Sequence, residues 1–142
     1  MNILVINGPN LNLLGHREPE HYGLETYDDL CRLVTAYAAS RGHRVQCFQS
    51  NHEGAIIDVI QAAQEACDGI VINPGAYSHY SYAIYDALLA VTVPAVEVHI
   101  SDISQREPFR RQSVTASACR GQIMGHGFQG YLEAVDLLET LL

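Results

Sequence analysis

The sequence contains 142 residues, of which 48% are hydrophobic, and it carries a formal net charge of −8. This length and composition predict a single globular domain over residues 1–142 and exclude a disordered chain. The negative charge argues against a general nucleic-acid-binding protein, and no apolar run is long enough to span a membrane. The amino terminus has no basic segment before its short apolar run, which predicts a cytoplasmic protein rather than a secreted one.

The basic and sulfur-containing residues narrow the possible chemistry. All eight basic residues are arginine, and the chain has no lysine. Arginine does not form a Schiff base at physiological pH, so imine chemistry through lysine, pyridoxal-phosphate anchoring and a P-loop are excluded. The four cysteines are widely spaced without a CxxC motif, and we expect them to be reduced.

Short apolar strands alternate with amphipathic helices along the chain. In order, we expect strands at about 2–7, 44–49, 69–73, 94–99 and 121–125, and helices at about 26–40, 54–67, 79–90 and 129–141. The first helix has the clearest boundaries, since Thr26 and Asp29 form a weaker capping box and Gly42 follows the helix end. This alternation predicts an α/β flavodoxin-like three-layer sandwich, with a five-stranded parallel sheet in the order 2-1-3-4-5.

A long polar segment separates the first strand from the first helix. It runs over seventeen residues, from Asn7 to Gly23, whereas most βα connections take about two to six residues. Its side chains include Asn10, Arg17 and Tyr22. A segment of this length at the carboxyl end of a strand predicts an active-site lid.

Polar residues also follow the other predicted strands. They are Asn7 and Asn10 after the first strand, Asn73 after the third, and Glu97, His99 and Ser101 at the end of the fourth. Ligands of open α/β sheets bind outside the carboxyl ends of the strands. This clustering favours an enzyme over a binding scaffold.

Two residue pairs suggest acid–base chemistry. Glu97 and His99 point to the same face of a strand because side chains alternate with a period of two, and a carboxylate can fix the tautomer of an imidazole and make it a better acid. A histidine bonded only to backbone is the structural alternative.

Arg17 could lower the pKa of the Tyr22 phenol, which would otherwise be too high for a base at neutral pH. An arginine packed on an exposed tyrosine ring is the alternative for this pair.

Three further motifs concern binding. The segment 73–79 either holds a polyol or carboxylate through Asn73 and His79 or simply shapes a turn. The arginines at 106, 110 and 111 suit a small anionic ligand. The glycines of residues 125–130 match GxGxxG, but the chain has too few residues beyond them for a dinucleotide site, so we interpret them as a tight turn. The histidines lack zinc-site spacing, and we expect no metal.

Taken together, these segments resemble the type II 3-dehydroquinate dehydratases. The matching blocks extend from about Ile3 to Leu132, nearly the whole chain, and occur in a consistent order. They are NGPN at 7–10, GHREP at 15–19, Tyr22-Gly23, residues 73–77 with His79, residues 86–88, EVHIS at 97–101, Arg106 with Phe109-Arg110, and residues 125–131.

The resemblance implies a cofactor-independent hydro-lyase that converts 3-dehydroquinate to 3-dehydroshikimate by anti elimination through an enolate. Tyr22 would be the base, and Arg17 would hold it as phenolate. Asn10 would orient a water that supports the enolate. His99, oriented by Glu97, would protonate the departing hydroxyl.

The resemblance also implies the substrate contacts and the assembly. The substrate carboxylate and ring hydroxyls would contact Asn73, His79, Ile100, Ser101, Arg110 and, from a neighbouring subunit, Asp86. The family forms dodecamers built from trimers, and we expect a homo-oligomer of this kind. Tyr85 departs from the family pattern, because an arginine commonly precedes the Asp86 position; this puts the inter-subunit charge contacts near Asp86 in question.

Other functions stay open from the sequence. The same reaction serves either the shikimate pathway or quinate breakdown. A related hydro-lyase would act on another cyclic hydroxy-ketoacid. A flavodoxin-like module would bind FMN or a protein partner, although Pro9, Leu11 and Leu13 suit a phosphate loop poorly.

Overall fold

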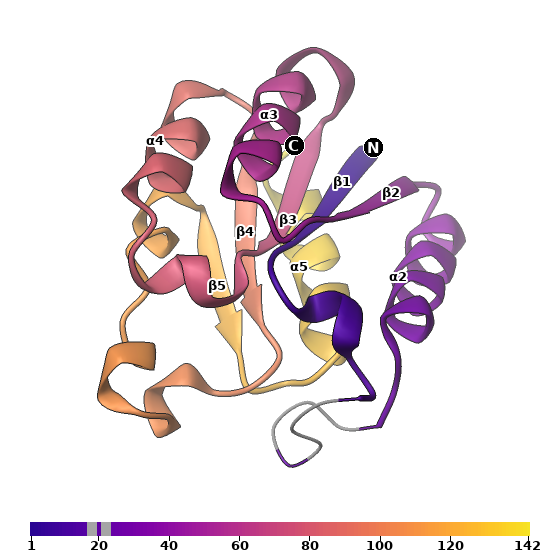
Figure 1. Cartoon of the computed structure of the whole chain (residues 1–142). Coiled ribbons are helices and arrows are strands. Elements are labelled where there is room, and N and C mark those ends of the chain that lie inside the picture. The colour runs from indigo at the N-terminus through magenta and orange to yellow at the C-terminus, as the bar shows by residue number, and fades with distance from the viewer. Residues whose placement is uncertain (17–19, 21–23) are drawn as a thin grey trace.

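The computed structural model describes residues 1–16, 20 and 24–142. The predicted lid therefore lies partly outside the described residues, and so do Arg17 and Tyr22. The described residues form a parallel five-stranded sheet with helices on both faces (Figure 1). The strands are β1 (Asn2–Asn7), β2 (Arg44–Gln49), β3 (Gly69–Asn73), β4 (Ala95–His99) and β5 (Gly121–Met124). The helices are α2 (Tyr27–Ser40), α3 (Glu53–Ala66), α4 (Tyr82–Ala90) and α5 (Gln129–Thr140).

The sheet order is β2-β1-β3-β4-β5, which confirms the predicted flavodoxin-like topology. The central strands are buried on both faces, so alternate residues of one strand enter two different cores. Ile3 and Val5 of β1 pack in the core beneath α2 and α5. Leu4 and Ile6 of the same strand pack with α3 and α4. The two cores cover both faces of the sheet, and the site residues lie at its carboxyl edge.

Local signals determined most element boundaries. The capping box of α2 is present, since Thr26 Oγ1 accepts from the Asp29 N–H at 3.1 Å and Asp29 Oδ2 accepts from the Thr26 N–H at 2.9 Å. Gly125 and Gly127 have φ angles of 82° and 58°, a conformation that favours glycine, as expected for a tight turn.

The predicted start of the third helix was wrong by three residues. Residues Gly75–His79 form a short 3-10 helix, η2, and α4 begins only at Tyr82. Ser81 sets this boundary, because its Oγ accepts from the Ile84 N–H at 3.0 Å while donating to Glu53 Oε2 at 2.5 Å. His79 therefore lies at the sheet edge in η2 instead of on α4.

Between β4 and β5 the chain has no regular strand or long helix. It forms three further 3-10 turns, η3 (Ile103–Gln105), η4 (Pro108–Arg110) and η5 (Ala116–Ala118). In Figure 1 this orange segment lies beside the carboxyl ends of β4 and β5. It carries the arginines toward the same edge of the sheet as the polar residues of β1 and β3.

Candidate active site

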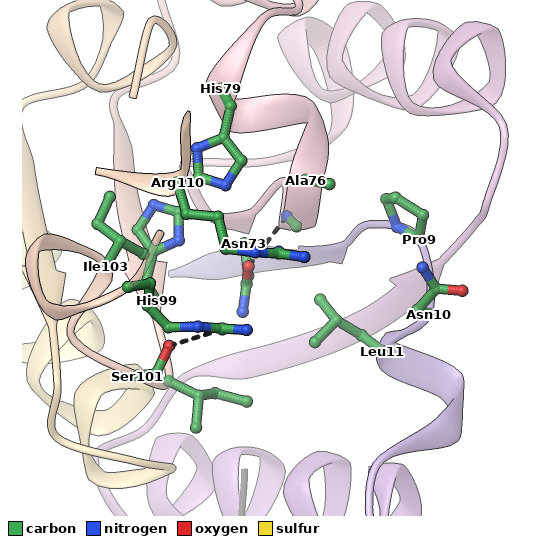
Figure 2. A pocket seen from close by; sticks show the side chains of 13 residues that line it. Pro9, Asn10, Leu11, Asn73, Ala76, His79, His99, Ser101, Ile103 and Arg110 are labelled. Atoms are coloured by element: carbon green, nitrogen blue, oxygen red, sulfur yellow. Dashed lines mark hydrogen bonds between the residues drawn. The ribbon is translucent and has the colours of Figure 1, made fainter. Parts of the chain in front are cut away.

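A pocket opens at the carboxyl edge of the sheet, between the ends of β1, β3 and β4. Its lining is Pro9, Asn10, Leu11, Asn73, Gly75, Ala76, His79, His99, Ile100, Ser101, Ile103, Arg106 and Arg110. Figure 2 shows His79, His99 and Arg110 on one side and Pro9, Asn10 and Leu11 on the other. The chain leaves β1 toward β2 and reaches β3 on the opposite side, so the pocket is at the topological switch point of the sheet.

Two interlocking loops form one wall of this pocket. The Gly8 N–H donates to the Asn73 carbonyl at 2.8 Å, joining the turn after β1 to the turn after β3. A Cβ at Gly8 would lie 2.3 Å from the Pro74 carbonyl oxygen, so only glycine permits this approach. The next turn holds Asn10 in the left-handed region with φ of 69°, a conformation that asparagine tolerates better than most residues. Its N–H donates to Asn51 Oδ1 at 3.0 Å.

His99 and Glu97 form a buried pair at the end of β4. His99 Nε2 lies 2.7 Å from Glu97 Oε2, and the two side chains are 6% and 0% exposed. The contact confirms the alternation predicted from the sequence. Glu97 lies behind the histidine and has no exposed surface, so only the imidazole of this pair lines the pocket.

Three more donors surround the Glu97 carboxylate. Ser113 Oγ donates to Oε2 at 2.6 Å, Gln122 Nε2 donates to Oε2 at 3.0 Å, and Thr115 Oγ1 donates to Oε1. Burial alone raises the pKa of the Glu97 carboxyl, but the His99, Ser113 and Thr115 hydrogen bonds outweigh burial and leave that pKa below its usual value. Glu97 is therefore an ionised acceptor, and His99 Nε2 must be the donor.

A second buried network supports Asn73. Asn73 Nδ2 donates to the Tyr131 hydroxyl at 3.0 Å, and Asn73 Oδ1 accepts from the Gly75 N–H at 3.1 Å. Tyr131 in turn donates to Asn7 Oδ1 at 2.6 Å. Both polar atoms of the Asn73 side chain are therefore fixed by hydrogen bonds, and the second N–H of its Nδ2 remains to donate to a ligand.

His79 and Arg110 come from the two turns above the pocket. His79 Nδ1 donates to the Gln112 carbonyl at 2.8 Å, which leaves Nε2 as an acceptor in the neutral ring. Burial lowers the pKa of His79 by more than the hydrogen bond to Gln112 raises it, and the nearby His99 and Arg110 lower it further. Arg110 Nε donates to Glu107 Oε2 at 2.5 Å, and its guanidinium lies 4.8 Å from the Phe109 ring centroid. A neutral acceptor and a cation thus face one cavity.

The structure brings most of the predicted site residues together. The lining includes Asn10, Asn73, His79, His99, Ile100, Ser101 and Arg110. Asp86 is exposed on α4 and does not line this pocket of its own chain. Arg17 and Tyr22 lie outside the described residues.

Some residues of the site had no individual role assigned from the sequence. Arg106 lines the pocket, is 8% exposed, and donates from Nη1 to Ser101 Oγ at 3.4 Å. The sequence placed Arg106 in a cluster of arginines suited to a small anionic ligand but gave it no more specific role. Ser113, Thr115 and Gln122 lie around Glu97 without any local signal, because they come from a turn and from another strand.

The described part of the chain holds no group of three or more histidine, cysteine, aspartate or glutamate side chains placed to bind a metal ion. Of the described helices, none is long and apolar enough to cross a membrane.

The pocket and fold can be compared with known proteins. Residues 1–139 match the family described as "Dehydroquinase class II". The chain belongs to the class II dehydroquinase family. Among the similar curated dehydroquinases, the 3-dehydroquinate dehydratase of Clostridium acetobutylicum is 56% identical, over 100% of this chain and 99% of that protein. That of Thermotoga neapolitana is 57% identical, over 99% and 96%.

Solved dehydroquinase structures share the whole fold. The type II dehydroquinase of Butyrivibrio crossotus is 57% identical with a TM-score of 0.96, covering 98% of this chain and 97% of that one. A 3-dehydroquinate dehydratase-like protein of Bifidobacterium longum is 29% identical with a TM-score of 0.73, covering 99% and 97%. Membership in this family of dehydratases makes the chain an enzyme, a hydro-lyase.

Proposed function

We propose that the chain is a type II 3-dehydroquinate dehydratase, which removes water from 3-dehydroquinate to give 3-dehydroshikimate by anti elimination. The observation that carries the proposal is the buried pair of His99 and Glu97 at 2.7 Å, with the imidazole lining a pocket that also holds Asn73 and Arg110. This arrangement presents a proton donor beside groups that bind a carboxylate and hydroxyls, as such a substrate requires.

His99 is the acid in this proposal. Its Nε2 donates to the ionised Glu97, so Nδ1 is the nitrogen that remains for the substrate. Nδ1 gives its proton to the hydroxyl leaving C1, and the product water departs. A positioned acid of this kind contributes about 10²–10⁴-fold to the rate.

Tyr22 is the proposed base, held as phenolate by Arg17. It removes a proton from C2, next to the ketone, and the resulting enolate is supported by a water that Asn10 orients. Stabilising such an oxyanion supplies several kcal/mol of barrier reduction. The support for Tyr22 and Arg17 is the match of their motifs to the family, since both lie outside the described residues. Neither proton transfer requires a metal or organic cofactor.

The remaining pocket groups bind the substrate. The Asn73 amide and the backbone N–H groups of Ile100 and Ser101 take the carboxylate. His79 and Arg110 contact the ring hydroxyls, and the neutral Nε2 of His79 accepts one hydroxyl proton.

We also propose that the chain forms a dodecamer of trimers in which Asp86 completes a neighbouring subunit's site. Large apolar side chains are exposed on and near α4, as a buried subunit contact requires: Tyr80 at 60%, Tyr82 at 69%, Leu89 at 56% and Phe109 at 61%. Light scattering on the purified protein tests the assembly. A mass of one 15.6 kDa chain would overturn it.

The activity has a direct test. Adding the purified protein to 3-dehydroquinate should produce the absorbance of the conjugated enone. Tyr22→Phe should abolish turnover while largely preserving substrate binding, and retained activity would remove Tyr22 as the base. Absence of turnover by the unaltered protein would overturn the function, and a yellow purified protein would point to the flavin-binding alternative.

We propose that the protein acts in the shikimate pathway, in the cytoplasm, and quinate breakdown is the alternative pathway.

A further inference from the structure

The surroundings of Glu97 contain more donors than a partner for His99 requires. Besides His99, the carboxylate accepts from Ser113, Thr115 and Gln122, which come from the turn after η4, from the residue before η5 and from β5. Gln122 lies directly opposite Glu97 in the β4–β5 register. Four donors therefore converge on a side chain with 0% exposure.

The contacts from Ser113, Thr115 and Gln122 favour the ionised form of Glu97. A carboxylate has about four lone-pair sites and no proton to give, whereas a protonated carboxyl must donate one hydrogen bond. Ser113 Oγ accepts from the Ala116 N–H at 3.2 Å, so its own proton is available for Glu97. The Gln122 amide nitrogen can only donate. A proton on Glu97 could point only toward His99 Nε2, because the Ser113, Thr115 and Gln122 contacts each need an acceptor oxygen.

From this arrangement we infer that Thr115 and Gln122, together with Ser113, are positioning residues that keep Glu97 ionised and aimed at His99 Nε2. Through Glu97 they hold the reactive proton on His99 Nδ1, at the pocket. None of the three lines the pocket, so they act on the acid rather than on the substrate. The assignment rests on the proposed function of His99.

The physical reason lies in how the Glu97–His99 pair shares its protons. In a buried site, a poorly solvated carboxylate tends to take a proton from its neighbour unless other donors stabilise the charge. If Thr115 and Gln122 lost their polar groups, the shared proton would move toward Glu97. His99 would then be a neutral ring that keeps only its Nδ1 proton, and a neutral imidazole is a much weaker acid than an imidazolium, so the hydroxyl would leave with less assistance.

The experiment compares Thr115→Val/Gln122→Met with the unaltered protein, with Thr115→Ser as the conservative variant. Thr140→Val is the matched control, since Thr140 Oγ1 donates only to the Leu137 carbonyl at the end of α5. We expect kcat to fall about tenfold or more, within the about 10²–10⁴-fold that an acid contributes, while KM stays within about threefold. Thr115→Ser should retain most of kcat.

A second measurement follows Glu97 itself and does not depend on turnover. Infrared difference spectra against Glu97→Gln identify the pH at which the Glu97 carboxyl gains its proton. We expect that pH to rise by about one unit or more in the double variant and to be unchanged in Thr140→Val. This titration separates the two proposals, because a protein that fails to turn over 3-dehydroquinate still reports the state of Glu97.

Several results would overturn the inference. They are an unchanged kcat in the double variant, an unchanged Glu97 titration, or a KM that rises as steeply as kcat falls. Circular dichroism checks folding. If Thr115→Val does not fold, Gln122→Met alone decides the question by the same two measurements, since Gln122 is exposed on the edge strand β5.

Discussion

Tyr131 and Asn73 are hydrogen-bonded at 3.0 Å although 58 residues separate them in the chain. The Tyr131 ring is fully buried in the core beneath α5, and burial raises the pKa of its hydroxyl, so it remains a neutral phenol. The same hydroxyl donates to Asn7 at 2.6 Å. One side chain of α5 thereby joins the carboxyl ends of β1 and β3 and orients the amide that faces the pocket.

Tyr131→Phe tests this bridge. Removing the hydroxyl leaves Asn7 Oδ1 and one Asn73 N–H buried without a partner, and each such loss costs about 1–3 kcal/mol. We expect the free energy of unfolding in urea to fall by that order and KM for 3-dehydroquinate to rise. Tyr37→Phe is the matched control, since its hydroxyl donates to Asp136 in a partly exposed position and the loss of stability should be smaller. Equal losses in the two variants would contradict a special role for the bridge.

Gly8→Ala tests the contact between the two loops. The added Cβ would lie 2.3 Å from the Pro74 carbonyl oxygen, so the end of β1 must move away from β3. We expect a loss of about 1–3 kcal/mol in urea unfolding, and a fall in kcat/KM because Asn10 moves with the loop. Gly54→Ala is the control, since nothing lies within 4 Å of its Cβ and the position is helical. That variant should be stabilised by about 0.5–1 kcal/mol; unchanged stability of Gly8→Ala would disprove the close contact.

The Glu97 carboxyl predicts how stability changes in acid. Its pKa in the folded protein is lower than in the unfolded chain, so its contribution is present above the unfolded value of about 4.3 and is lost as the pH falls toward the folded value. We expect the urea midpoint of the unaltered protein to decrease between about pH 5 and pH 3. Glu97→Gln should be less stable at neutral pH and show a shallower decrease. Parallel curves for the two proteins would show that Glu97 is not preferentially ionised in the folded state.

Cys31 is the thiol that should react first with an alkylating reagent. The hydrogen bond from Cys47 chiefly lowers the pKa of Cys31 to about 7, and the Tyr27 hydroxyl adds to this effect, whereas burial raises the pKa of Cys119 to about 12. Because the thiolate is the nucleophile, iodoacetamide should modify Cys31 with a half-maximal rate near pH 7. Mass spectrometry after limited labelling measures the order, with Cys31→Ser as control. Faster labelling of Cys119 would contradict the prediction.

Local patterns in the sequence predicted much of the fold and part of the site. The alternation of short apolar runs and amphipathic segments indicated all five strands, and Thr26 with Asp29 marked the start of α2. The two-residue period of a strand predicted that Glu97 and His99 share a face, and their contact is confirmed. These features depend on residues a few positions apart, so the chain order alone specifies them.

The start of α4 was harder to predict, because an apolar pattern does not distinguish the 3-10 helix at 75–79 from the first turn of an α-helix. Ser81 sets the start of α4, because its Oγ is hydrogen-bonded to both the Ile84 N–H and the Glu53 carboxylate, and Glu53 lies 28 residues away. The boundary thus depends on a contact with another helix.

The sequence by itself indicated the parallel α/β architecture, excluded imine chemistry through lysine, and placed Glu97 and His99 on one face of a strand, since each follows from composition or from neighbouring residues. Only the tertiary structure decided which groups support that pocket. Tyr131 reaches Asn7 across 124 residues, and Gln122 reaches Glu97 across 25. Such contacts exist because packing of the sheet and its helices brings distant segments together, and no local pattern in the sequence predicts them.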